Sequence, residues 1–67
     1  MIYVNGTPTD AGDAPTIRDV LLSVDIDPQT PGIAVAVDAE VARRGVWAIR
    51  TVPDGARVEI VTAVQGG

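Results

Sequence analysis

The chain has 67 residues, and its nine acidic and five basic side chains give it a net charge of −4. This length fits one small domain, and the negative charge disfavours nucleic acids and anionic membrane surfaces as partners. Histidine, cysteine and lysine are absent, which excludes disulfides, zinc sites of the Cys/His type, histidine acid–base catalysis and lysine Schiff bases. No apolar run approaches the roughly 18 residues of a membrane span, and the start has no signal-peptide pattern. We therefore expect a cytoplasmic binding or carrier module rather than an enzyme.

The first elements predicted are two short strands joined by a tight turn. Residues 1–4 are apolar and β-prone, and Asn5-Gly6 is a strong signal for a two-residue hairpin turn. The returning strand, residues 7–10, contains Pro8, which has no backbone N–H to donate to a neighbour. We therefore expect this strand at an edge of the sheet.

A helix is predicted next. Thr16 has the side chain of an N-cap residue, and Asp19 stands three residues later, as in a capping box. An apolar face with helical spacing follows, made of Ile17, Val20, Leu21 and Val24. The two prolines of residues 25–32 end the helix.

The second half of the chain predicts three strands and one helical turn. Residues 32–37 alternate β-branched residues with alanine, and residues 40–42 form a short strand after a turn at Asp38-Ala39. Residues 43–49 are expected to form a helical turn around Trp47. The turn signal Pro53-Asp54-Gly55 precedes a strand over residues 57–64.

Two features of the helical turn allow more than one interpretation. We expect Trp47 to be a half-buried cover over a thin core. The neighbouring pair Arg43-Arg44 is expected to be solvated at the surface, and contact with an acidic patch on a partner is the alternative.

These elements predict an α+β roll with a mixed sheet of four to five strands and one main helix packed on one face. The first and last strands can then lie side by side. If Val58 and Ile60 face the helix, alternation places a weakly polar set of residues on the opposite face. We expect this set to be the partner-docking surface; it consists of Tyr3, Ala34, Ala36, Val61 and Ala63.

The last three residues, Gln65-Gly66-Gly67, are expected to form a flexible tail on a domain of residues 1–64. A frayed or truncated end is the alternative interpretation. Glycines have no Cβ and can thread a narrow channel of a partner. The terminal carboxylate is ionised at neutral pH and can attack the α-phosphate of a nucleotide held by a partner enzyme. This chemistry needs no catalytic side chain and no metal or cofactor bound by this chain.

With these segments, the sequence resembles the ThiS family of sulfur carriers in thiamine biosynthesis, which have the ubiquitin-like β-grasp fold. The resemblance covers essentially the whole chain. The segments that carry it are Ile2–Gly6, Thr16–Leu22, Gly32–Asp38, Val41–Arg43, Trp47-Ala48, Asp54–Val61 and Thr62–Gly67. The ending Thr-Ala-Val-Gln-Gly-Gly is the most specific of them. The turn Asp38-Ala39-Glu40 departs from the family, which usually has Asn-Gly before the acid.

The resemblance implies a protein cosubstrate and not an enzyme. An adenylating enzyme related to ubiquitin activators would use ATP and Mg to adenylate the carboxylate of Gly67. A cysteine desulfurase relay would supply sulfur for a thiocarboxylate, which would donate it to thiazole synthase. Gly66 and Gln65 would thread the partner's active site. The carrier is expected to be a monomer when free.

Three other functions remain open from the sequence. The chain resembles carriers for molybdopterin or other thiolation pathways in its terminal Gly-Gly, although the molybdopterin subunit is usually longer. A ubiquitin-like modifier joined to lysines would use the same carboxylate. A plain β-grasp interaction domain would use the sheet and not the tail.

Overall fold

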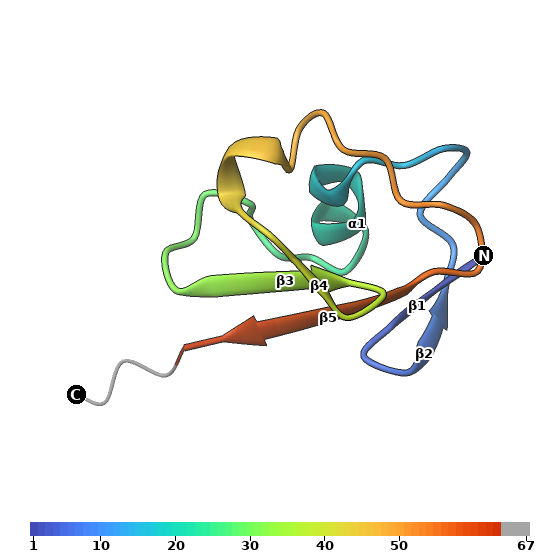
Figure 1. Ribbon diagram of the computed structural model, residues 1–67, viewed down its shortest axis with the longest axis horizontal. Helices are drawn as coiled ribbons and strands as arrows, with labels where there is room; N and C mark the ends of the chain where they lie inside the picture. Colours follow the sequence, from blue (N-terminus) through green and yellow to red (C-terminus); the bar gives the residue numbers. More distant parts are fainter. Residues whose placement is uncertain (64–67) are drawn as a thin grey trace.

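The computed structural model describes residues 1–63, which fold as a five-stranded sheet and one α-helix (Figure 1). The elements are β1 (Ile2–Val4), β2 (Thr7–Thr9), α1 (Ile17–Ser23), β3 (Ile33–Val37), β4 (Glu40–Ala42), the 3-10 turn η1 (Arg44–Val46) and β5 (Arg57–Thr62). This succession confirms the predicted order of elements. The helical turn is shorter than the predicted 43–49, and β5 ends before Ala63.

The strands lie in the order β2-β1-β5-β3-β4. The first strand, β1, pairs in parallel with the last one, β5, so that Tyr3 lies beside Arg57, and the other neighbours are antiparallel. The mixed sheet and the neighbouring first and last strands are therefore confirmed. Pro8 lies in β2, at an edge of the sheet, as its missing N–H predicts.

The start of α1 is held by the predicted capping box. The backbone N–H of Asp19 donates to Oγ1 of Thr16 at 3.1 Å, and the backbone N–H of Thr16 donates to Oδ2 of Asp19 at 2.9 Å. Two backbone donors that the first turn leaves without helical partners are satisfied in this way. The cap sets the helix register, which turns Ile17, Val20 and Leu21 into the core.

The core lies between α1 and one face of the sheet (Figure 1). Val35, Val58 and Ile60 meet the helix from β3 and β5, as the alternation predicts. Full burial of a Val, Leu or Ile side chain stabilises the fold by about 1.5–3 kcal/mol, so this interface is the main source of stability. By alternation along β5, Thr62 should share the inward face with Val58, but its side chain is exposed.

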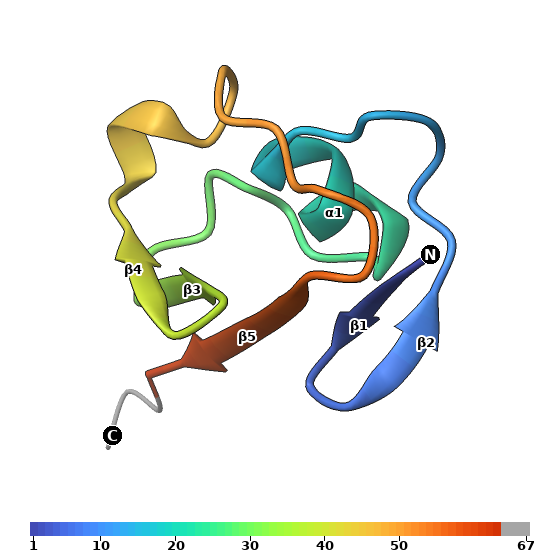
Figure 2. The same cartoon turned by 45° about the vertical axis from the view of Figure 1, so that its right-hand side comes forward.

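Trp47 is not the half-buried cover that we expected, because only 3% of its surface is exposed. Its Nε1–H donates to the carbonyl oxygen of Ala42 at 2.8 Å, which satisfies the buried indole nitrogen. The chain after η1 passes over α1, and the Arg18 backbone N–H donates to the carbonyl of Trp47 at 2.9 Å (Figure 2). The crossing segment is bonded to the start of α1 a second time, because the Ile17 backbone N–H donates to the carbonyl of Arg50 at 3.0 Å.

Two turn residues bond to β5 through their side chains. The amide of Asn5 donates from Nδ2 to the carbonyl of Ile60 at 3.1 Å and accepts from the Ile60 N–H at 2.9 Å. Along the other edge of β5, where β3 pairs with it, Oδ1 of Asp38 accepts from the backbone N–H of Arg57 at 2.9 Å. Both residues have a positive φ, 48° and 50°, which Asn and Asp tolerate better than most residues. These side chains continue the pairing where β1 and β3 turn away.

We expect replacement of Asn5 by Ala to lower the free energy of unfolding by about 2–3 kcal/mol, because it removes both bonds to Ile60 and puts Ala at a positive φ. Asn5→Gly removes the bonds without the backbone strain and should cost about 1–2 kcal/mol. Urea denaturation measures both values. If Asn5→Gly has the same free energy of unfolding as wild type, the Asn5 amide does not hold β5.

The capping box predicts a pH dependence. The backbone hydrogen bond from Thr16 is the main cause that lowers the pKa of Asp19 below its ordinary value of 3.8, with smaller contributions from the Thr16 side chain and Arg18. A carboxyl whose pKa is lower in the folded state stabilises the fold at pH values above its unfolded-state pKa. This contribution is lost as the pH falls through the folded-state pKa.

Wild type should therefore be more stable than Asp19→Asn at neutral pH, and the difference should shrink below about pH 4. Thermal unfolding of the two proteins across this range measures the effect. Since Arg18→Gln leaves the cap intact, it is the control and should keep most of the pH dependence. A difference between wild type and Asp19→Asn that stays constant on acidification would contradict this explanation.

Candidate functional site

The face of the sheet opposite α1 is covered by no other segment of residues 1–63 (Figure 2). All five residues predicted for the docking surface lie on this face and are exposed or half-buried. Val41 joins them, because it pairs with Ala36 across β3 and β4 and is 76% exposed. We call this set the open-face patch; it consists of Tyr3, Ala34, Ala36, Val41, Val61 and Ala63.

The register of the strands explains why the open-face patch is apolar and flat. Ala34 lies opposite Val61, and Ala36 lies opposite Glu59, in the β3–β5 ladder. Directly opposed residues of an antiparallel pair point to the same side of the sheet. The small side chains of the two alanines leave a shallow depression at the centre of the face. Val61, 61% exposed, projects beside them. Contiguous exposed apolar residues make a surface a candidate interaction site.

The charged residues Arg57 and Glu59 form a border between Tyr3 and the rest of the open-face patch, because Arg57 pairs with Tyr3 and Glu59 with Ala36. A hollow of about 570 Å³ lies there, lined by Tyr3, Asn5, Gly6, Arg57, Val58 and Glu59. Arg57 and Glu59 alternate with the inward Val58, so both have the strand parity of Val61. This border gives one positive and one negative group with which a partner can be oriented.

The end of β5 is held against the start of β3. The Ala63 backbone N–H donates to the carbonyl of Gly32 at 2.7 Å. A Cβ at Gly32 would lie 3.4 Å from the Cβ of Ala63, which is ordinary van der Waals contact. Gly32 has a φ of +81°, so the backbone conformation favours glycine here. Val64 and the predicted tail residues Gln65, Gly66 and Gly67 lie outside the described residues.

The described residues contain few groups for chemistry of their own. Over residues 1–63, no three His, Cys, Asp or Glu side chains come together in a way that could hold a metal ion. In the same range, no helix has the length and apolar character needed to cross a membrane. The exposed apolar residues of the open face and the register of β3 and β5 make the open-face patch the candidate site.

A mixed five-stranded sheet with parallel first and last strands, and with one helix on one face, defines a ubiquitin-like β-grasp protein. The family model described as ThiS family matches residues 1–67. The chain belongs to the ThiS family.

Two solved structures support this assignment. The crystal structure of a thiamine biosynthesis protein (ThiS) from Geobacter metallireducens is 28% identical, with a TM-score of 0.77 over 98% of this chain and 97% of that one. An NMR structure of a thiamine biosynthesis protein from the same organism is also 28% identical, with a TM-score of 0.76 over 98% and 86% of the two chains. No curated protein matches the sequence.

Sequence reasoning missed three residues near the site. Val41 was placed on a strand but not on the docking face, because the β4 register depends on the turn before it. Asn5 was interpreted only as a turn residue, although its side chain also holds β5. Arg44 is exposed, as expected, but the sequence did not predict that its guanidinium bonds to backbone carbonyls of the loop between α1 and β3.

Proposed function

We propose that this protein is a sulfur carrier in thiamine biosynthesis and that the carboxylate of Gly67 carries the sulfur. The observation that carries the proposal is the ThiS family match over the whole sequence, which includes the final Gly66-Gly67. Both structural neighbours are thiamine biosynthesis proteins, which supports the pathway.

The proposed chemistry takes place on the terminal carboxylate. A carboxylate oxygen attacks the α-phosphorus of ATP, pyrophosphate leaves, and an acyl-adenylate forms. A sulfur nucleophile then attacks the carbonyl carbon, the bond to the phosphate oxygen breaks, and AMP leaves. With persulfide sulfur from the relay, the first product is an acyl disulfide. A thiol then reduces its S–S bond and releases the thiocarboxylate, whose sulfur is passed to thiazole synthase.

The division of labour fits the composition of the chain. Without histidine, cysteine or lysine, the carrier supplies the reacting carboxylate and a docking surface. An adenylating enzyme related to ubiquitin activators supplies ATP, Mg and positioning, and a cysteine desulfurase relay supplies the sulfur. We propose that these reactions take place in the cytoplasm, that the carrier is not itself an enzyme, and that it is a monomer when free.

We also propose that the open-face patch docks on the adenylating enzyme. Val61 and Ala63 belong to the patch and lie in β5 and directly after it, so the bound surface and the proposed tail are continuous in sequence. A partner that covers this patch would hold the reacting end close to its own active site, which raises the effective concentration of the carboxylate.

We expect one residue added after Gly67 to reduce sulfur loading at least tenfold without changing the thermal unfolding temperature, because the carboxylate is displaced in the partner's channel. The protein is incubated with the adenylating enzyme, ATP and a sulfur source. Intact-mass spectrometry then detects the exchange of one oxygen for sulfur. Gly67→Ala should also load poorly, because a Cβ narrows the fit.

The same assay separates the alternatives. Adducts linked to lysines of other proteins would support a modifier, and no change in wild-type mass would support a plain interaction domain. Normal loading of the extended variant would refute the role of the Gly67 carboxylate. Thiazole formation after addition of thiazole synthase distinguishes a thiamine carrier from carriers of other pathways.

A charge on the open-face patch should weaken activation and leave the fold intact. We expect Val61→Asp to raise the KM of the adenylating enzyme for the carrier about tenfold or more, because a buried unpaired carboxylate costs free energy in the complex. Ile49→Asp is the matched control, because Ile49 is 76% exposed and lies outside the patch. Equal adenylation kinetics for the two variants would exclude the patch as the docking surface.

A further inference from the structure

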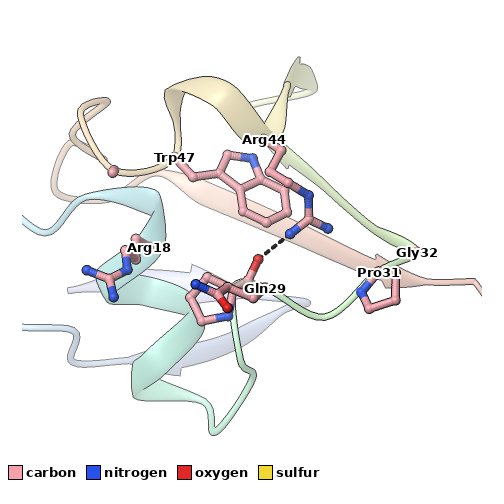
Figure 3. Close-up of a pocket in the computed structure, with 8 residues that line it drawn as sticks. Arg18, Gln29, Pro31, Gly32, Arg44 and Trp47 are labelled. Carbon is pink, nitrogen blue, oxygen red and sulfur yellow. Dashed lines mark hydrogen bonds between the residues drawn. The ribbon is translucent and has the colours of Figure 1, made fainter.

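The loop between α1 and β3 packs against the helical turn η1. A hollow of about 590 Å³ lies between them, lined by Arg18, Pro28, Gln29, Pro31, Gly32, Arg44, Trp47 and Ala48 (Figure 3). We call residues 27–32 the strap. It contains two prolines, and Asp27 closes a turn within it by accepting from the backbone N–H of Gln29 at 2.9 Å. The strap is therefore locally stiff.

Arg44 bonds to the strap at two points. Its Nη1 donates to the carbonyl of Pro28, and its Nη2 donates to the carbonyl of Thr30 at 2.7 Å (Figure 3 shows the first contact). The two nitrogens of one planar group thus reach alternate carbonyls of the same loop. Arginine offers this forked geometry, whereas lysine has a single charged nitrogen.

The indole ring of Trp47 supports the guanidinium of Arg44. The guanidinium carbon of Arg44 lies 4.6 Å from the centroid of the Trp47 ring, a distance at which cation–π attraction acts. The ring is buried and is held in turn by its bond to the carbonyl of Ala42. The guanidinium of Arg44 therefore contacts a side chain of the core that is itself firmly held.

The strap ends at the residue that holds the end of β5. Gly32 follows Pro31 directly, and its carbonyl accepts the Ala63 N–H. A Cβ on Gly32 would already reach van der Waals contact with the Ala63 side chain, so the two backbones lie close together. A continuous series of contacts thus runs from Trp47 through Arg44 and the strap to Ala63.

We propose that Arg44 is a positioning residue for the reacting end of the carrier. By holding the strap against Trp47 it fixes Gly32, and Gly32 fixes Ala63, from which the last four residues of the chain continue. The consequence for activation rests on the proposed function, since it assumes that the Gly67 carboxylate is adenylated. The contact series itself does not depend on that assumption.

The first test measures hydrogen exchange of the Ala63 amide by NMR in wild type, Arg44→Gln and Arg44→Lys. We expect exchange about tenfold faster in both variants, because lysine keeps the charge but not the forked pair of bonds. The Ile60 amide, which bonds to Asn5, reports general loss of stability and should change much less. Arg43→Gln is the matched control, since Arg43 neighbours Arg44 in sequence and has no side-chain cap bond at η1.

The second test measures adenylation of the same variants. Strand ends open at little cost in free energy, so loss of the Arg44 bonds should reduce the fraction of molecules in which Ala63 is held. The KM for the carrier should rise about two- to fivefold with kcat unchanged, since only the competent fraction changes. Arg43→Gln should match wild type.

The outcomes separate this proposal from the proposed function. Equal Ala63 exchange in Arg44→Gln and Arg43→Gln would overturn the proposal, whether or not the carrier is adenylated. Faster exchange with unchanged KM would also overturn it, because Ala63 would then not position the reacting end. If wild type is not adenylated at all, the proposed function fails and with it the positioning role, while the exchange data still establish whether Arg44 holds Ala63.

Discussion

The pairing of β5 with β1 on one side and β3 on the other is the interaction on which the rest of the structure depends. It joins the two ends of the sequence in the middle of the sheet. The alternation of β5 then decides which side chains enter the core and which form the open-face patch, so a shift of one residue would exchange the faces. Asn5 and Asp38 bond to the β5 backbone from opposite sides and oppose such a shift.

This arrangement separates the residues that stabilise the fold from those of the proposed docking surface. The helix side of the sheet holds Val35, Val58 and the helix residues, whose burial stabilises the fold. The other side holds alanines and exposed valines, which contribute little to the core. The proposed reaction uses neither side, since it takes place on the last residue of the sequence.

Local patterns were sufficient to predict most of the fold. The capping pair Thr16 and Asp19 and the alternation that turns Val58 and Ile60 inward act within a few positions of the sequence, and both predictions are confirmed. The burial of Trp47 was underestimated, because it depends on how the chain crosses α1. The bonds of Arg44 were missed for a similar reason, since they join segments whose packing no local pattern specifies. Of the candidate site, the sequence predicted the residues whose face follows from alternation along a strand. It did not predict Val41 or the contacts between distant segments.

The position of Pro8 has a consequence for how the molecule behaves among many copies of itself. An outer strand normally offers a row of free donors and acceptors to which a foreign strand can add, the first step towards fibrous aggregates. In β2 that row is only three residues long, and its central member cannot donate. The β2 edge of the sheet is therefore a poor template for the growth of such aggregates.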